Sequence, residues 1–183
     1  MGIARLKNQS VYVAGPLDSL VDINDGIKWR NNLKPFFDSI NVKVNDPCDK
    51  PCQRADEINH PREVRQQYYQ NKEWDKLSKL YKEIIKVDLR LVDQSTILVA
   101  LLDMSPEIKL TGTIHEIVLS SQQRKNIFIV CPQGLQKIPP WWYGLLDYRL
   151  FFDNFEDMKK VLLDIDSGIE TRFDDKFVFF DKI

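Results

Sequence analysis

The sequence predicts an α/β protein of the doubly wound class, with a mostly parallel sheet of five strands and helices on both faces. Short apolar runs with strand character alternate along the chain with longer segments whose apolar residues recur every three or four positions. Two of the short runs, 96–102 and 126–131, are apolar on both faces, which is typical of strands buried inside a parallel sheet. We therefore expect residues 1–183 to form a single α/β domain.

The first part of the chain predicts two strands, one helix and an insertion. Residues 10–14 are a β-branched and aromatic run that stops at a Gly-Pro pair, and residues 42–44 form a second short strand. Residues 26–39 have the apolar spacing of a helix, which we expect Pro35 to distort. Residues 46–80 form the insertion, which is a Pro-rich loop at first and helical towards its end.

The rest of the chain continues the alternation of helices and strands. Apolar residues three and four positions apart predict a long helical stretch over 62–92. The remaining predicted elements are a strand at 96–102, a helix at 113–124, a strand at 126–131, a fifth strand at 148–152 and a last helix at 154–165. We interpret residues 167–183 as a C-terminal arm, part of which alternates weakly enough to form a strand.

Composition excludes several classes of function. The 26 Lys and Arg residues balance 27 Asp and Glu residues, so a polymeric nucleic acid is not an expected partner. Only 7 of 183 residues are Gly, and no glycine-rich dinucleotide or triphosphate loop occurs. No apolar run approaches the ~18 residues of a membrane span, and the first ten residues lack the apolar stretch of a signal peptide. We expect a cytoplasmic protein that needs no cofactor and no membrane.

Three cysteines raise the question of a metal. Cys48, Cys52 and the nearby His60 could supply three metal ligands, but their spacing is not that of a zinc knuckle and no fourth ligand is evident. Cys131 is far from them in sequence. We therefore expect free thiols in a reducing compartment and no metal site.

Glu116 is the leading candidate for chemistry. It follows the start of the predicted helix 113–124, where free N–H groups and the positive end of the helix dipole favour an ionised carboxylate. An ionised carboxylate at a strand-to-helix junction can attack an electrophilic sugar carbon. The alternative is structural, because Thr113 and Glu116 have the spacing of a helix capping box.

Three further residues are candidate catalytic groups. Asp88 shares a helix face with Ile84 and Leu91, so burial would raise its pKa, which suits a general acid. The alternative is an Asp that is hydrogen-bonded or ion-paired, for example with the side chain of Lys86 or Arg90. Asp103 ends a buried strand, where it is either a site residue or a turn residue. A buried Tyr12 hydroxyl needs a partner, which a site carboxylate can supply, although packing alone also explains this tyrosine.

Substrate-binding residues are expected beyond the carboxyl ends of the strands, where ligands of doubly wound proteins bind. Arg30 is a further candidate binding residue because it can reach an anion; the alternative is a surface position, which is the more common one for an arginine. The expected binding residues at these ends are Gly15, Pro16, Leu17, Asp18, Gly112 and Thr113.

Four segments in this order resemble the nucleoside 2-deoxyribosyltransferase family, in a divergent, transferase-like branch. They are 11–17 (VYVAGPL), 87–93 (VDLRLVD), 97–103 (ILVALLD) and 112–117 (GTIHEI). The resemblance implies a flavodoxin-like, Rossmann-like sheet and a small-molecule nucleoside or nucleotide substrate. It also implies a glutamate nucleophile at Glu116, acidic residues at Asp88 and Asp103 that handle the base, and Tyr12 orienting the glutamate. A glycosyl-enzyme intermediate would pass the sugar to a second base, without a cofactor.

The same resemblance leaves other functions open. Relatives with this fold hydrolyse nucleoside monophosphates at the N-glycosidic bond, in which case Ser19, Arg30 or Ser120 would bind the phosphate. A non-enzymatic nucleotide-sensing module is the third interpretation. The family also implies a homo-oligomer in which a neighbour's C-terminal region closes the sugar site, and residues 172–174 faintly resemble that region.

Overall fold

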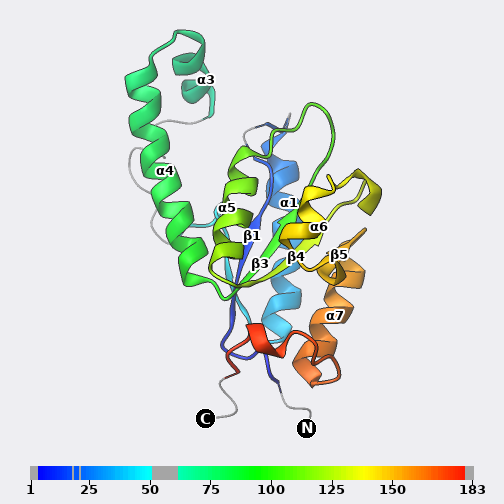
Figure 1. Cartoon of the computed structure of the whole chain (residues 1–183). Coiled ribbons are helices and arrows are strands. Elements are labelled where there is room, and N and C mark those ends of the chain that lie inside the picture. The colour runs from blue at the N-terminus through cyan, green and yellow to red at the C-terminus, as the bar shows by residue number, and fades with distance from the viewer. Residues whose placement is uncertain (1–3, 18, 21, 51–61, 180–183) are drawn as a thin grey trace.

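A wholly parallel sheet of five strands forms the centre of the computed structural model, which describes residues 4–17, 19–20, 22–50 and 62–179 (Figure 1). The strands are β1 (Ser10–Ala14), β2 (Lys43–Asn45), β3 (Ile97–Leu101), β4 (Asn126–Val130) and β5 (Phe151–Phe152). Their spatial order is β2-β1-β3-β4-β5. The chain therefore adds β2 on one side of β1 and β3 on the other side. Doubly wound sheets open a crevice for ligands between two such strands, here β1 and β3.

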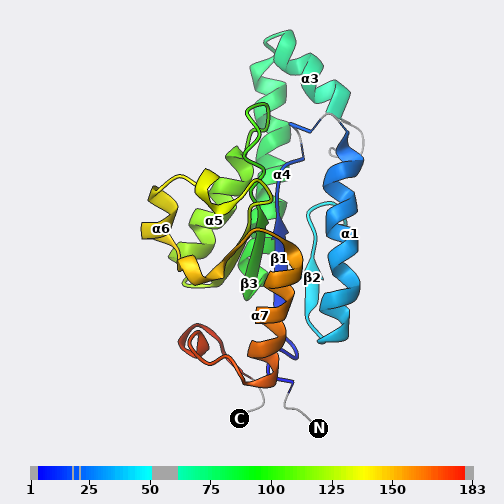
Figure 2. The same cartoon turned by 90° about the vertical axis from the view of Figure 1, so that its right-hand side faces the viewer.

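Helices cover both faces of this sheet, as the sequence predicts (Figure 2). The helices are α1 (Ile23–Ser39), α3 (Arg62–Gln70), α4 (Trp74–Gln94), α5 (Thr111–Gln122), α6 (Trp141–Leu145) and α7 (Phe155–Ser167). Short 3₁₀ turns lie at Leu135–Lys137, Tyr148–Leu150 and Asp174–Lys176. The α1 helix begins three residues earlier than predicted, because the Asp22 carboxylate caps it by accepting from the Asn24 amide, and it continues through Pro35.

The strands alternate their side chains between two apolar clusters. One cluster joins Val13, Val99 and their neighbours to α1 and α7, and the other joins Ala100 and its neighbours to α4, α5 and α6. Both clusters consist of residues that are almost entirely shielded from water. The two-faced apolar pattern of the strands therefore has the cause that the sequence predicts, because each face packs against its own set of helices.

The predicted helical stretch 62–92 is in fact two helices, α3 and α4. The break is at residues 71–73, where Lys72 takes a left-handed backbone conformation with φ of 58°. The Glu73 amide bonds back to the Tyr68 carbonyl at 2.9 Å, which closes the end of α3. Beyond the break, α3 and the first turns of α4 project past the edge of the sheet (Figure 1).

The predicted strand at 148–152 is also mostly wrong, because its first three residues form a 3₁₀ turn and only two pair with β4. Helix α6 was not predicted. The helix expected from residue 113 begins at Thr111, two residues earlier.

The described part of the C-terminal arm forms no strand and instead packs against its own chain. Phe173, Phe177 and Phe179 are buried in the cluster beneath α1 and α7. Asp174 pairs with Arg5, just before β1, so the arm lies at the amino-terminal edge of the sheet (Figure 1). The predicted ligand crevice is at the opposite edge of the sheet, so the described part of the arm does not reach the crevice of its own chain.

One buried arginine joins α1 to the end of β1. The Arg30 guanidinium is fully shielded from water and donates to the backbone carbonyls of Gly26 (2.7 Å), Gly15 (2.9 Å) and Val13 (3.3 Å). Its Nε lies 3.7 Å from the buried Asp46 carboxylate, which balances its charge. Arg30 therefore fixes the loop that leaves β1 at the crevice.

We expect Arg30→Met to lower the free energy of unfolding by about 3 kcal/mol or more, because it leaves three carbonyls and the Asp46 carboxylate without their buried donor. Urea denaturation measures the loss. Lys28→Met, at an exposed position of the same helix, is the control and should change stability little. Equal stability of the two variants would contradict the structural role of Arg30.

Candidate active site

A cavity of about 1060 Å³ opens at the carboxyl edge of the sheet. Its walls come from the loop after β1, the loop after β2, the inner face of α4 and the start of α5. Arg65 of α3 also lines it. The predicted residues that line it are Gly15, Pro16, Leu17, Ser19, Asp88, Gly112, Thr113 and Glu116. Segments far apart in the sequence therefore meet where the strand order predicts a ligand site.

Glu116 is held in the cavity wall by a tyrosine from the centre of the sheet. The Tyr12 hydroxyl donates to Glu116 Oε1 at 2.6 Å, and the Tyr12 side chain is fully shielded from water. Burial raises the pKa of Glu116 to about 7, while the hydrogen bond from Tyr12 opposes the rise. The nearby Asp88 carboxylate raises this pKa further, and the charges of Arg30 and Lys50 lower it. Glu116 thus changes its charge near neutral pH.

Two expectations for Glu116 are wrong. Thr113 does not cap the helix, because α5 begins at Thr111, its N-cap is Leu110 and no side chain bonds there. Glu116 consequently lies in the second turn of α5, beyond the N–H groups that are free in the first turn. The raised pKa shows that loss of water around the carboxylate outweighs the helix dipole, which was expected to favour the ionised form.

Asp88 faces the same cavity from α4 and forms an ion pair. Its Oδ1 lies 2.9 Å from Lys50 Nζ, and the Lys50 side chain is only 3% exposed. The ion-pair alternative is therefore the one that the structure has, with a partner from the loop after β2 rather than from the same helix. A close ammonium favours the ionised carboxylate, which disfavours the general-acid role expected for Asp88.

The glycine at the end of β1 lets another side chain approach closely. A Cβ at Gly15 would lie 2.8 Å from Trp29 Cζ2, so any larger residue would move the tryptophan or the loop. Pro16 and Leu17 follow it along the cavity wall. Asp18, also predicted to bind substrate, lies outside the described residues.

Besides Tyr12, which reaches Glu116 from behind the cavity wall, three predicted site residues do not line the cavity. Arg30 and Ser120 are completely buried, so the binding contacts expected of them are not those of the structure. Asp103 accepts hydrogen bonds from the Ser105 amide and hydroxyl and from Gln133 Nε2, as a turn residue does. The strand-end position of Asp103 brings it near this edge of the sheet, but its carboxylate is bound within the loop.

Several residues of the cavity were not predicted as site residues. Lys50, Arg65, Lys109 and His115 contribute cationic or titratable groups. Lys50 lies in the loop part of the insertion, where no periodic pattern indicates which side chains turn inward, and Arg65 lies in the part predicted to be helical. Cys48 also lines the cavity, and burial raises its pKa to about 11, so its thiol is protonated at neutral pH and is a weak nucleophile.

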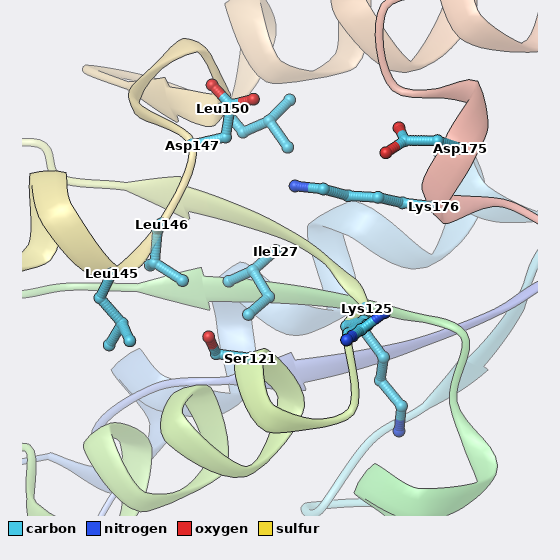
Figure 3. A pocket seen from close by; sticks show the side chains of 10 residues that line it. Ser121, Lys125, Ile127, Leu145, Leu146, Asp147, Leu150, Asp175 and Lys176 are labelled. Carbon is cyan, nitrogen blue, oxygen red and sulfur yellow. The ribbon is translucent and has the colours of Figure 1, made fainter.

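A second cavity of about 280 Å³ lies away from these groups, near the amino-terminal end of β4 (Figure 3). Lys176 extends across it towards Asp147 and Leu150, whereas Lys125 turns away and donates to the Val92 carbonyl. No predicted site residue lines this cavity.

Metal binding and membrane insertion find no support in the described segments. Cys52 and His60, two of the three residues of the zinc alternative, lie outside the described residues. Within the described ranges, no three His, Cys, Asp or Glu side chains gather as metal ligands would. None of the described helices combines the length and apolar character needed to cross a bilayer.

The fold is one that 2-deoxyribosyltransferases have. The enzyme from the psychrotolerant bacterium Bacillus psychrosaccharolyticus superposes with a TM-score of 0.54 at 15% identity, over 82% of this chain and 90% of that chain. The enzyme from Leishmania mexicana superposes with a TM-score of 0.50 at 16% identity, over 85% and 97% of the two chains. No protein-family model and no curated protein matches the chain. At these identities the likeness confirms the α/β doubly wound, flavodoxin-like fold.

We expect Glu116→Gln to stabilise the protein above neutral pH. The pKa of Glu116 is raised from 4.5 to about 7, so the stability provided by its neutral form is complete below pH 4.5 and is lost as the pH rises through about 7. Glutamine keeps the neutral form at every pH. The variant should exceed the parent by up to about 3 kcal/mol at pH 8 and differ little at pH 4.5, measured by urea denaturation. A stability difference that does not change with pH would contradict the burial of this carboxylate.

Proposed function

We propose that this protein is a nucleoside 2-deoxyribosyltransferase-like enzyme, which cleaves the N-glycosidic bond of a deoxynucleoside and transfers the sugar to another base. The observation that carries the proposal is Glu116, a carboxylate that Tyr12 orients at 2.6 Å in the wall of a cavity beyond the carboxyl ends of the strands. The fold shared with two 2-deoxyribosyltransferases supports it. So do the four sequence segments that resemble the family.

The proposed first step uses the ionised Glu116. Tyr12 occupies Oε1, so Oε2 attacks the anomeric carbon of the sugar. A bond from this oxygen to the anomeric carbon forms as the bond to the base nitrogen breaks, and the electron pair leaves with the base. Negative charge near the sugar stabilises the oxocarbenium-like transition state. The departing base takes up a proton from water at the nitrogen that leaves the sugar. A second base then attacks the same carbon, releases the carboxylate and gives the proton of its attacking nitrogen to water, so the two steps balance without an external reagent.

The proposed roles of the other cavity residues follow from their positions. Asp88 lies with Glu116 in the cavity, where its ionised carboxylate can accept hydrogen bonds from the N–H groups of a base. The apolar side chains of Ile27 and Ile84 and the ring of Tyr81 line the same cavity and suit the faces of a planar base. We further expect a homo-oligomer in the cytoplasm, acting on a small molecule, as the family resemblance implies.

The central test is base exchange. The protein is incubated with a deoxynucleoside and a second free base, and chromatography follows both nucleosides. Glu116→Gln should lower kcat/KM by about a thousandfold or more, because the nucleophile is lost. Glu107→Gln changes an exposed carboxylate of the same cavity and is the matched control. In the parent, kcat/KM should rise as the pH increases through about 7, where Glu116 ionises.

A second candidate function is hydrolysis of a deoxynucleoside monophosphate at the same bond. The cationic side chains of Arg65 and Lys109 line the cavity and favour an anionic substrate. The same assay separates the two functions when a monophosphate is supplied without an acceptor base. Release of free base supports the hydrolase, and exchange that requires the acceptor supports the transferase. Turnover by neither route, with any of the common bases, would contradict both.

A further inference from the structure

The cavity holds two carboxylates and one buried cation. Asp88 from α4 and Glu116 from α5 both line it, and each charge disfavours the ionisation of the other. Lys50 is the cation: its Nζ lies 2.9 Å from Asp88 Oδ1 and its side chain is 3% exposed. A lysine this deeply buried is costly for the fold unless its charge is matched, and Asp88 matches it.

We propose that Lys50 is a positioning residue of this site: its ion pair with Asp88 fixes that carboxylate in the cavity wall and compensates its charge, so that Asp88 and Glu116 can both be ionised in one cavity. The proposal rests on the proposed function for its catalytic meaning, since an attack by Glu116 requires the ionised carboxylate. The effect of Lys50 on the charges of Asp88 and Glu116 does not depend on that function.

Among the described residues, two cations lower the pKa of Glu116: Arg30, which has the larger effect, and Lys50. Tyr12 from β1 donates a hydrogen bond but carries no positive charge. Arg30 from α1 has its guanidinium engaged by three backbone carbonyls and lies near Asp46, so its charge is already partly balanced. Asp88 from α4 is the nearby anion.

Other charged or titratable groups line the same cavity. They are Cys48 after β2, Arg65 from α3, Glu107 and Lys109 from the loop before α5, and His115 from α5. Glu107, Lys109 and His115 are exposed, so water screens their effect on Glu116. Lys50 differs from Lys109 in being buried, and charge interactions are stronger in such surroundings.

The loop after β2 places Lys50 through a chain of local contacts. The Asp46 carboxylate accepts from the Cys48 amide at 2.8 Å, which turns the backbone at the end of β2. Lys34 from α1 bonds Asp46 and Asp49, at 3.2 and 3.1 Å, and holds the outside of the turn. The chain then enters the cavity wall at Lys50, across from α4.

The test is a titration of Glu116 that needs no turnover. Protein labelled with ¹³C at the glutamate side-chain carboxyl is titrated by NMR, and the signal missing in Glu116→Gln assigns the residue. Lys50→Met keeps most of the aliphatic stem and removes the charge. We expect the midpoint of Glu116 to move up, because Lys50 is one of the two cations that lower the pKa of this carboxyl. Lys50→Arg restores the charge and should return the midpoint towards that of the parent.

Two further variants make the result specific. Asp88→Asn removes the like charge and should lower the midpoint of Glu116. Lys109→Met removes an exposed cation of the same cavity and should leave the midpoint unchanged. If Lys50→Met does not fold, as judged by its amide NMR spectrum, Lys50→Gln takes its place.

An unchanged midpoint in the folded Lys50 variant, or an equal shift in Lys109→Met, would overturn the proposal. The midpoints also separate this proposal from the proposed function. A shifted midpoint in a protein without base exchange supports the role of Lys50 and contradicts the proposed transferase function. Base exchange with an unshifted midpoint supports the proposed enzyme and contradicts the role of Lys50. Where exchange is found, the acid limb of kcat/KM in Lys50→Met should move up with the midpoint.

Discussion

A carboxylate that has lost most of its water must be stabilised by its neighbours, and this constraint governs the cavity at the carboxyl edge of the sheet. The closest neighbour of Glu116 is the Tyr12 hydroxyl, which comes from the central strand β1 and cannot move without disturbing the sheet. Burial still dominates, and the pKa of Glu116 is about 7. The site therefore keeps a carboxylate close to its change of charge, where small changes in nearby groups decide its state.

The fold supplies the rigidity that this arrangement needs. The β1 strand pairs on both sides, with β2 and β3, and Arg30 fixes the loop that follows it through the carbonyls of Val13 and Gly15. Tyr12 and Glu116 lie 104 positions apart in sequence, so their hydrogen bond depends on the register of the parallel sheet. The arm with Phe173 packs at the other edge of the sheet, and the walls of the cavity come from the loops after β1 and β2 and from α3, α4 and α5.

The sequence predicted the core of this structure better than its site. The two-faced apolar strands and the order of elements have local signatures, and Glu116, Tyr12 and Asp88 were found from their positions relative to those elements. The break at Lys72 was not predictable, since a lysine in a left-handed conformation has no pattern like that of glycine. Lys50 was missed because a charged residue in an irregular loop gives no sign that it turns inward. Arg30 was predicted to bind substrate, with a surface position as the alternative; its burial was missed because it depends on carbonyls that only the folded chain brings together.

The account depends on Glu116 forming a covalent bond to the sugar. The most direct measurement is mass spectrometry of the protein, rapidly quenched in acid during reaction with a deoxynucleoside and then digested. The account predicts one added 2-deoxyribosyl group on the peptide that contains Glu116, and its disappearance when an acceptor base is added before the quench. Base exchange at full rate in Glu116→Gln, or an adduct on another residue, would contradict it.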